Sequence, residues 1–184
     1  MPAIPPDLFA YFAKLGIETE TFEHPPVFTV AESRSIKAAI AGGHSKNLFL
    51  KDKKDRIFLV VARDETRIDL KKLHETIGAS GRLSFGSPDL LRATLGVEPG
   101  SVTPFALIND AERRVAVVLD ASLMAFARVN FHPLINSMTT TIGSEDFLAF
   151  LRATGHEARV LRLPEPASEA SADSARAEPA LDLK

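Results

Sequence analysis

The order in which strand-like and helix-like segments follow one another limits the fold more than any other feature of this chain. Residues 47–50 and 57–62 are apolar runs joined by a charged stretch at 52–55, a pattern typical of a β-hairpin. Single amphipathic segments precede and follow this hairpin. Because hairpins alternate with single helices, the chain does not repeat as βαβ units, so a doubly wound parallel sheet is disfavoured. The order predicts one α+β domain with a mixed, largely antiparallel sheet flanked by helices.

Apolar spacing together with Gly, Pro, Ser and Thr signals gives the approximate bounds of each element. Thr29 followed by Glu32 predicts a capping box, Ser87-Pro88 a helix start, and Ser144 another helix cap. Helices are expected near residues 6–15, 29–40, 69–77, 87–95 and 144–154. Strands are expected near residues 19–24, 47–50, 57–62, 81–85, 115–119, 128–132, 136–142 and 159–163.

Composition divides the chain into residues 1–163, a single domain, and residues 164–184, a tail rich in Ala, Ser, Pro and Glu. Too few large apolar residues follow position 163 to offset the entropy of ordering, so the tail is expected to be disordered. The whole chain has 22 Lys and Arg against 24 Asp and Glu. Because the tail holds five acids and two bases, the domain keeps 20 bases and 19 acids, about +1. This near-neutral balance is compatible with local contact to RNA ends but not with a general nucleic-acid binder.

Several classes of protein are disfavoured by what the sequence lacks. Without cysteine there are no disulfides, thiolate nucleophiles or Cys-type zinc sites. No apolar run approaches 18 residues and the first residues do not resemble a signal peptide, so a cytoplasmic protein without membrane contact is expected. The five histidines are scattered without metal-ligand spacing, and no nucleotide-binding fingerprint is present, so neither a metal nor a cofactor is expected. A monomer is expected.

Lys46 is the most unusual charge, because it lies in an otherwise apolar strand. By period-2 alternation it shares a face with Leu48 and Leu50. If that face is core, the ammonium group is partly desolvated and requires an anion such as a phosphate, carboxylate or oxyanion. The alternative is a strand-end lysine that reaches solvent.

The segment Gly100-Ser101-Val102-Thr103-Pro104 is a loop of small side chains. Its glycine would let a ligand approach the backbone closely, and successive amides could receive an oxyanion. The alternative is a turn that merely links two elements. The functional interpretation requires that the amine of Lys46 and this stretch of main chain face each other across a single small cavity.

Two further groups are candidates for the same site. His132 lies in Asn130-Phe131-His132-Pro133, shortly before the threonines at 139–141. Threonine-rich strands are often only good β-formers, so this pattern has a structural alternative. The basic residues at 51–56 suit either a solvated hairpin tip or a phosphate contact.

Three segments, 46–52, 96–105 and 130–136, taken together resemble one family. It comprises the YbaK/prolyl-tRNA synthetase-associated editing domains, and the similarity is to its free-standing prolyl-tRNA deacylases of the ProXp-ala (PrdX) branch. The resemblance covers roughly residues 5–163 and implies hydrolysis of the ester in mischarged Ala-tRNA(Pro), with neither a metal nor a protein nucleophile. The tail is not part of it.

The resemblance also implies roles for particular residues. Lys46 matches the essential lysine of the family and would bind the terminal phosphate or sugar. In the loop, the Gly100 carbonyl would hold the substrate ammonium, and amides at Ser101 and beyond would polarise the ester. The neighbouring ribose hydroxyl would place or activate water. Further candidate substrate-binding residues are His44, Asn47, Val102, Thr103, Pro104, Asn130 and His132.

The partners implied are the 3′ end and acceptor stem of tRNA(Pro), with prolyl-tRNA synthetase or an elongation factor as further candidates. Three alternatives stay open at this level. The chain could deacylate another tRNA, such as Cys- or Ser-tRNA. It could be a non-catalytic module that binds tRNA ends or a synthetase, or an α+β domain that binds a small molecule without RNA.

Overall fold

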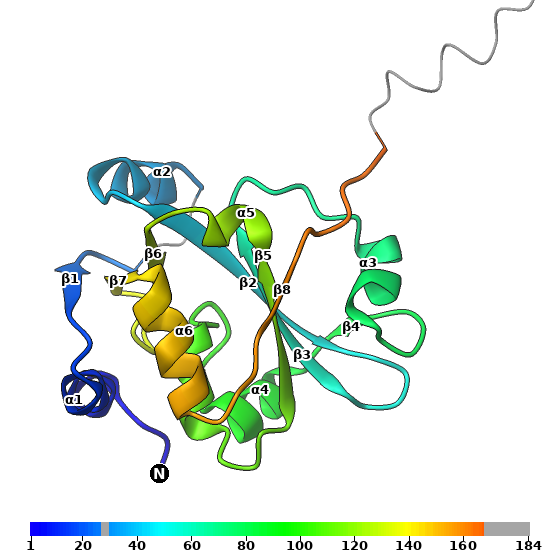
Figure 1. Ribbon diagram of the computed structural model, residues 1–184, viewed down its shortest axis with the longest axis horizontal. Coiled ribbons are helices and arrows are strands. Elements are labelled where there is room, and N and C mark those ends of the chain that lie inside the picture. Colours follow the sequence, from blue (N-terminus) through cyan, green and yellow to red (C-terminus); the bar gives the residue numbers. More distant parts are fainter. Residues whose placement is uncertain (27–29, 168–184) are drawn as a thin grey trace, which may run out of the picture.

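The computed structural model describes residues 1–26 and 30–167. Its centre is an eight-stranded mixed sheet in which seven strands follow the order β1-β7-β6-β2-β3-β5-β8, while β4 pairs with β2 (Figure 1). Four pairings are antiparallel (β1–β7, β6–β7, β2–β3, β2–β4), and three are parallel. The strands are β1 (Thr19–Glu23), β2 (Gly43–Lys51), β3 (Ile57–Arg63), β4 (Ser84–Phe85), β5 (Val115–Asp120), β6 (Arg128–Phe131), β7 (Met138–Gly143) and β8 (Arg159–Leu161). The expected mixed sheet and the expected hairpin are confirmed.

The helices also follow the sequence signals closely. They are α1 (Pro5–Leu15), α2 (Val30–Ala39), α3 (Leu70–Ile77), α4 (Pro88–Leu95), α5 (Ala121–Met124) and α6 (Ser144–Ala153), with a 3₁₀ segment η1 (Pro104–Asn109). Ser87 caps α4 by accepting from the Leu90 amide. The expected cap at Ser144 is wrong: Gly143 is the N-cap residue, and the Ser144 hydroxyl donates to the Phe126 carbonyl instead. The sequence did not predict η1 or α5.

Two expectations fall on residues that the structure leaves undescribed. Thr29, the first residue of the expected capping box, lies outside the described ranges, and so does the tail from residue 168 onward. The domain boundary therefore stays a prediction. Leu163 is buried, and the Pro164 carbonyl accepts a hydrogen bond from the Asp69 amide at 2.7 Å, so residue 164 still contacts the domain.

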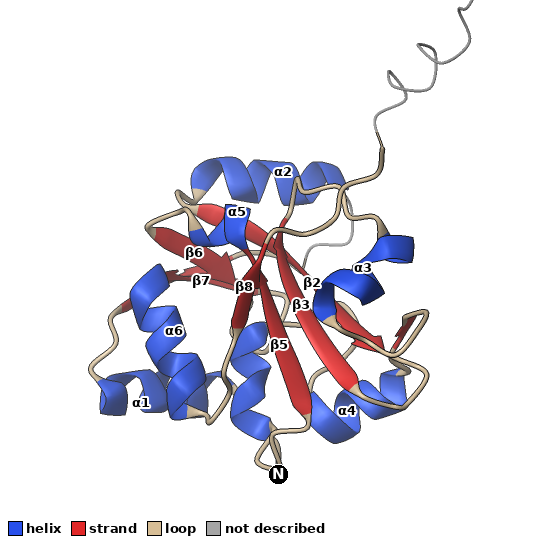
Figure 2. Ribbon diagram, turned by 45° about the vertical axis from the view of Figure 1, so that its right-hand side comes forward, coloured by secondary structure: helices blue, strands red, loops and turns tan. Residues whose placement is uncertain are grey.

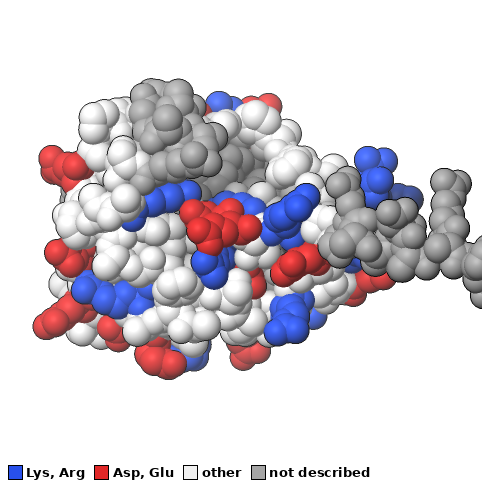
Figure 3. All heavy atoms as spheres, turned by 90° about the horizontal axis from the view of Figure 1, so that it is seen from above, with Lys and Arg blue, Asp and Glu red and all other residues white. Residues whose placement is uncertain are grey.

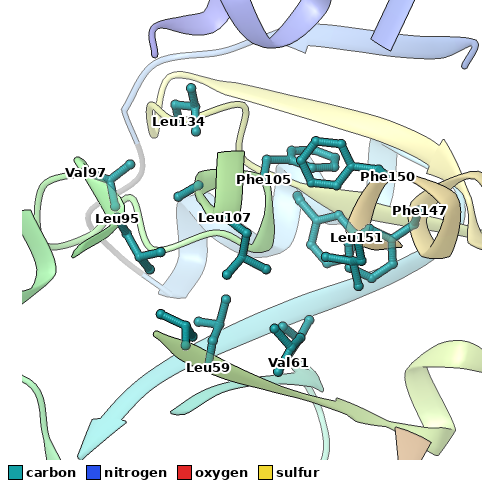
Figure 4. Packing of buried hydrophobic residues seen from close by; sticks show 14 of the residues in the cluster. Leu59, Val61, Leu95, Val97, Phe105, Leu107, Leu134, Phe147, Phe150 and Leu151 are labelled. Atoms are coloured by element: carbon teal, nitrogen blue, oxygen red, sulfur yellow. The ribbon is translucent and has the colours of Figure 1, made fainter. Parts of the chain in front are cut away.

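The larger core lies between one face of the sheet and the segments α1, α4, η1 and α6. Figure 4 shows Phe105, Phe147 and Phe150 gathered above Leu59 and Val61 of β3. Phe105 and Phe150 pack edge to face with ring centroids 5.6 Å apart, a favoured geometry for aromatic pairs. This core fixes the position of η1 and therefore of the 100–104 loop that leads into it.

The opposite face of the central strands is covered by α3. Leu73 and Ile77 of this helix pack in a second cluster with Leu50, Val60 and Val118. Figure 2 shows α3 and α6 on opposite sides of the β2–β3 hairpin. Because side chains alternate along β2, consecutive residues of this strand meet two different environments.

The surface shows no single dominant charge from the side of α2. In that view Lys and Arg are interspersed with Asp and Glu (Figure 3). Within the described ranges, no helix combines the length and the apolar character needed to span a membrane.

Candidate active site

Strand β2 positions the candidate site, because its first residues line the cavity described below. Asn47 pairs with Val61, and its side chain points to the face of the larger core. Lys46 pairs with Ala62, which belongs to the second cluster on the other face. The side chains of these two adjacent residues therefore lie on opposite faces of the sheet.

A small, largely polar cavity of about 130 Å³ lies at the start of β2, and we call it the polar pocket. Its walls come from α2, β2, β6 and β7 and from the residues that directly follow β1 and β6, which are distant in sequence. They consist of His24, Ile36, Lys37, His44, Ser45, Asn47, Asn130, Phe131, His132 and Thr139. This volume is far below the roughly 300–1,000 Å³ of pockets that hold drug-sized ligands, so it suits a small polar group.

A second cavity of about 190 Å³, the Phe85 pocket, meets the polar pocket at Asn47. Its walls are mainly apolar, and one of them is the loop predicted to bind substrate. They consist of Asn47, Phe49, Phe85, Gly86, Pro88, Leu91, Pro99, Gly100 and Val102. Asn47 is the residue that lines both cavities, so the two lie next to each other at this side chain.

Asn47 joins β2 to the loop. Its Nδ2 donates to the Val102 carbonyl at 2.9 Å. Because a carbonyl only accepts, this contact requires that the NH₂ group faces Val102 and that Oδ1 faces away. Oδ1 is buried and has no hydrogen-bond partner. A buried acceptor without a partner is costly, so its presence indicates a place for a ligand donor.

Two histidines of the polar pocket are held in defined tautomers. His132 Nδ1 donates to the Met138 carbonyl at 2.8 Å, which leaves Nε2 with its lone pair available. His24 Nδ1 donates to the Pro25 carbonyl, and its Nε2 accepts from Thr139 Oγ1 at 2.9 Å. His132 therefore has a free acceptor at Nε2, whereas both ring nitrogens of His24 are already hydrogen-bonded.

Burial lowers the pKa of His132, and the nearby His24 and Lys37 lower it further. The hydrogen bond to the Met138 carbonyl acts in the opposite direction but does not outweigh them. Lys37 itself pairs with Asp64 at 2.7 Å. His132 is thus neutral around pH 7 and can accept a proton or a hydrogen bond at Nε2.

The predicted site residues divide into three groups. His44, Asn47, Asn130 and His132 line the polar pocket, and Asn47, Gly100 and Val102 line the Phe85 pocket. Ser101, Thr103, Pro104 and Lys46 are not among the residues that line either cavity. Their predicted contact with substrate stays a prediction.

Some of the candidate residues have evident structural tasks. Thr103 is fully buried and its hydroxyl accepts from the Phe105 amide, which caps η1. Asn130 uses both ends of its amide: Nδ2 donates to the Ala41 carbonyl, and Oδ1 accepts from Thr141. His44 Nε2 donates to the Ile40 carbonyl at 2.8 Å. These residues shape the site, and their own polar groups are largely occupied.

The expectation that Lys46 and the 100–104 loop share one cavity is wrong in this structure. Lys46 shares its face with Leu48 and Leu50, as predicted, but the loop contacts the other face of β2 through Asn47. The Lys46 ammonium donates to the Thr66 carbonyl. The expectation ignored the alternation of side chains along the strand. The residue of β2 that contacts the loop is Asn47, and its neighbour Lys46 therefore points to the opposite face.

The carbonyl that receives Lys46 is itself well supported. The Thr66 hydroxyl donates to Asp120 Oδ2 at 2.7 Å, and so does the Ser122 hydroxyl. Burial raises the pKa of Asp120, but hydrogen bonds from Thr66, Ser122 and the Arg63 amide outweigh it and hold the pKa below its ordinary value. Asp120 therefore stays ionised and fixes the turn on which Lys46 rests.

Sequence reasoning missed His24, Lys37, Ser45, Thr139 and Phe85 as site residues. The β1–β7 pairing brings His24 and Thr139 together, although 115 positions separate them in the sequence. Thr139 belongs to the threonine run noted above, which was the available signal. In the described part of the chain, no three His, Asp or Glu side chains come together in a group suited to hold a metal ion.

The structure is a single small α+β domain. It has a polar pocket, a neighbouring apolar cavity and, between them, a side-chain amide whose oxygen has no partner. These features define a class of domains that bind a small chemical group. Comparison with known proteins makes this specific. The sequence profile of the family described as "Aminoacyl-tRNA editing domain" matches residues 24–150. The chain belongs to this family, and the membership confirms the expected fold class and the expected aminoacyl-tRNA deacylase activity.

Curated relatives of similar length agree. The chain is 41% identical over 157 residues to a zebrafish (Danio rerio) prolyl-tRNA synthetase associated domain-containing protein, covering 84% of this chain and 85% of that one. It is 37% identical over 157 residues to the prolyl-tRNA editing protein ProX of Acetoanaerobium sticklandii, covering 85% and 95%.

Solved structures support the fold alone, because their sequence identity is low. A crystal structure described as a candidate trans-editing enzyme for prolyl tRNA synthetase has a TM-score of 0.60 and 20% identity, covering 79% of this chain and 87% of that one. A crystal structure of a hypothetical protein gives a TM-score of 0.64 at 17% identity, covering 84% and 97%.

Proposed function

We propose that this chain is a trans-editing deacylase that hydrolyses the ester of mischarged Ala-tRNA(Pro) without a metal ion. Family membership supports aminoacyl-tRNA editing in general. The name of the bacterial relative, a prolyl-tRNA editing protein, supports tRNA(Pro) as the carrier. The choice of alanine rests on the small polar pocket and on the resemblance described above.

The unpartnered Oδ1 of Asn47 is the observation that carries this proposal. Asn47 lines both the polar pocket and the Phe85 pocket, and its buried Oδ1 needs a donor. The α-ammonium group of an aminoacyl ester supplies three donors and a charge, and hydrogen bonds to charged groups are among the stronger ones. Asn47 Oδ1, together with the Gly100 carbonyl, receives that ammonium group.

The ester then lies beside the Gly100–Pro104 loop. The Val102 amide donates to no group in the described part of the chain, so it is free to stabilise the negative charge that develops on the carbonyl oxygen. Water attacks the carbonyl carbon, the bond to the ribose oxygen breaks, and that oxygen leaves with a proton. The adjacent ribose hydroxyl helps to place the water, and neutral His132 offers Nε2 as a hydrogen-bond acceptor.

Discrimination against proline follows from pocket size. A synthetase pocket shaped for proline rejects a smaller apolar amino acid by only about 1–3 kcal/mol. A second site that admits alanine but cannot hold the pyrrolidine ring supplies the missing selectivity. The polar pocket, of about 130 Å³, is the cavity that we assign to this second site, and its shape rather than its volume has to exclude the pyrrolidine ring.

The same proposal covers the partners. By resemblance, Lys46 contacts a phosphate or the sugar of the terminal nucleotide. Because Lys46 faces the other side of the sheet from Asn47, this contact requires that its ammonium leaves the Thr66 carbonyl and reaches around the start of β2. The protein acts as a monomer in the cytoplasm on the 3′ end and acceptor stem of tRNA(Pro), either alone or beside prolyl-tRNA synthetase or an elongation factor.

A second candidate substrate is Ser-tRNA, favoured by the polar character of the pocket. His24, Ser45 and Thr139 could hydrogen-bond a substrate hydroxyl, and a site built for such a bond rejects the analogue that lacks it. Alanine, serine, cysteine and proline attached to the same tRNA(Pro), assayed side by side, distinguish the two candidates. Faster release of serine or cysteine than of alanine would replace the first candidate. Binding of charged tRNA that protects its ester would instead indicate a non-catalytic module.

Removal of the Asn47 side chain tests the proposed site. Asn47→Ala should lower kcat/KM on Ala-tRNA(Pro) by about 10- to 100-fold, the effect of losing a hydrogen bond to a charged group. Asn136→Ala is the matched control, because Asn136 lines neither cavity and should leave the rate unchanged. Circular dichroism checks that both variants are folded, and EDTA in the assay should not change the rate. Wild-type activity of the folded Asn47→Ala variant would contradict the assignment.

A further inference from the structure

The segment 96–103 joins α4 to η1 and contains the Gly100 main chain, which the proposed function places beside the ester. At Gly100 this main chain has little support of its own. The residue is exposed, its φ of 90° favours glycine, and no atom of the described residues, apart from its chain neighbours, lies within 4 Å of the position that a Cβ atom would take. The position of Gly100 must therefore be set by the contacts of the residues on either side.

Two contacts hold the middle of this segment. On the inner side, Asn47 Nδ2 donates to the Val102 carbonyl at 2.9 Å. On the outer side, the Ser101 amide donates to the Glu98 carbonyl at 2.9 Å, and the Glu98 carboxylate pairs with Arg92 of α4. Both members of this ion pair are exposed, and such pairs contribute little in water. The contacts at the two ends of the segment therefore matter more.

Asn109, the last residue of η1, closes the base of the segment. Its Nδ2 donates to the Leu95 carbonyl at 2.8 Å, which ties the last residue of α4 to the end of η1. Carbonyls in the last turn of a helix have no partner within that helix, and Asn109 supplies one from outside. Asn109 thus joins the two elements that the segment 96–103 connects.

The first residues of the chain hold the same junction from the other side. The Ala3 amide donates to Asn109 Oδ1 at 2.8 Å, so both ends of the side-chain amide are in use. Pro2 packs against Gly96, where a Cβ atom would lie 2.5 Å from the Pro2 Cβ. The path of these residues is fixed by α1, because Phe12 of that helix packs in the larger core.

Other contacts keep η1 itself in the fold. Phe105 and Leu107 are at most 1% exposed, and the Asp110 carboxylate, directly after η1, accepts from the Val115 amide at 2.8 Å. Asn109, in contrast, is only half-buried. Its two hydrogen bonds therefore decide where the segment 96–103 lies rather than whether η1 forms.

We propose that Asn109, together with Pro2 and Ala3, sets the position of the Gly100 main chain relative to Asn47, which makes Asn109 a positioning residue for hydrolysis of the ester. The inference rests on the proposed function, in which this main chain contacts the aminoacyl end. Pro2 and Ala3 lie outside the residues 24–150 that match the family profile.

Two substitutions of Asn109 test this role. Asn109→Ala loses both hydrogen bonds, whereas Asn109→Asp keeps the size of the side chain and an acceptor for Ala3 but cannot donate to the Leu95 carbonyl when ionised. On Ala-tRNA(Pro), both variants should lower kcat about 10- to 100-fold, because a misplacement of about 1 Å can cost a factor of about 10². KM should change less than about threefold, since the segment contacts only the aminoacyl end of a large substrate.

Tyr11→Phe is the matched control for stability. The Tyr11 hydroxyl donates to the Ala153 carbonyl at 3.0 Å, so this variant also loses a hydrogen bond that holds the N-terminal part, but not one at the segment 96–103. Thermal melting should show a decrease of less than about 8 °C in all three variants, as for loss of one or two hydrogen bonds. Tyr11→Phe should keep the wild-type kcat.

Hydrogen exchange reports on the segment directly, without any substrate. The Gly96 and Ser101 amides are both hydrogen-bonded. They should exchange about 3- to 10-fold faster in Asn109→Ala and Asn109→Asp than in the wild type, because the segment opens more easily once its base is released. In Tyr11→Phe they should exchange at the wild-type rate.

Each result has a defined meaning. Wild-type kcat in the folded Asn109 variants, a rise in KM alone, or unchanged exchange of both amides would overturn the positioning role while the deacylase proposal stands. A wild-type protein that hydrolyses no aminoacyl-tRNA, with faster exchange in its Asn109 variants, would support the placement of the loop by Asn109 and contradict the deacylase proposal.

Discussion

At the residue scale, the amide of Asn47 has its donor in use and its acceptor free. The contact from Nδ2 to the Val102 carbonyl fixes both the loop and the direction of Oδ1. Asn47 therefore holds the 100–104 loop, whose main chain is proposed to contact the ester, next to β2. The lysine before it, which has the more prominent sequence signal, faces the other side of the sheet.

The lowered pKa of His132 predicts how the rate depends on pH. An imidazole that must accept at Nε2 works only when neutral, and burial shifts its pKa below the ordinary value of 6.5. The enzymatic rate should therefore hold at pH 6.5 and above and fall as pH drops through the lowered pKa. The measurement is kcat/KM from pH 5 to 8, corrected for uncatalysed ester hydrolysis.

His132→Asn should remove this acid limb and lower the rate. His74→Gln, on α3 at the opposite face, serves as its control and should keep the wild-type profile. An unchanged acid limb in His132→Asn would show that another group titrates.

A separate prediction concerns Lys46, because its proposed contact with a phosphate does not involve the 100–104 loop. Lys46→Ala should lower kcat/KM at least about tenfold, since a charge-assisted contact to phosphate is lost. Lys46→Arg should retain part of the rate and show a similar dependence on salt. Full activity of a folded Lys46→Ala variant would remove this residue from the account.

At the element scale, the β2–β3 hairpin is anchored at its tip by a buried carboxylate. Asp52 accepts from the amides of Lys54, Arg56 and Ser80 and from the Arg56 guanidinium, so it also ties the hairpin to the segment that leads into β4. Burial raises the pKa of Asp52, but these hydrogen bonds outweigh it and lower the pKa from 3.8 to about 2.

This lowered pKa predicts a stability loss in acid. The contribution of Asp52, on the order of 2 kcal/mol, is complete above its unfolded pKa of 3.8 and is lost as pH falls toward 2. Asp52→Asn should therefore be less stable than wild type at pH 5, and this difference should shrink toward pH 2.5. Urea unfolding at both pH values measures it. Asp55→Asn, whose carboxylate is exposed, should show little of this pattern, and an equal effect of both variants would contradict the explanation.

Local signals predicted most of the elements, because they depend on residues close in sequence. The 52–55 turn predicted the hairpin, and Ser87-Pro88 predicted the start of α4. The segment η1 was missed because Phe105, Ala106 and Leu107 give a continuous apolar run without helical periodicity. Their conformation is decided by burial in the core, which is a tertiary effect.

At the scale of the whole molecule, the site is assembled by sheet topology. The pairing of β1 with β7 and of β6 with β2 brings His24, Thr139 and Asn130 to the start of β2. The sequence contains these residues but not the strand order, so their convergence was not predictable. The loop at 100–104 was identified from its glycine and small side chains, and Asn47 by resemblance, whereas the contact between them required coordinates.

The near-neutral domain must select its substrate by fit to the aminoacyl end rather than by bulk charge. The most direct test is the release of amino acid from Ala-tRNA(Pro) and from Pro-tRNA(Pro), measured side by side with the purified wild-type protein. The account predicts rapid release of alanine and no release of proline above the uncatalysed rate. Equal release of both, or of neither, would contradict it.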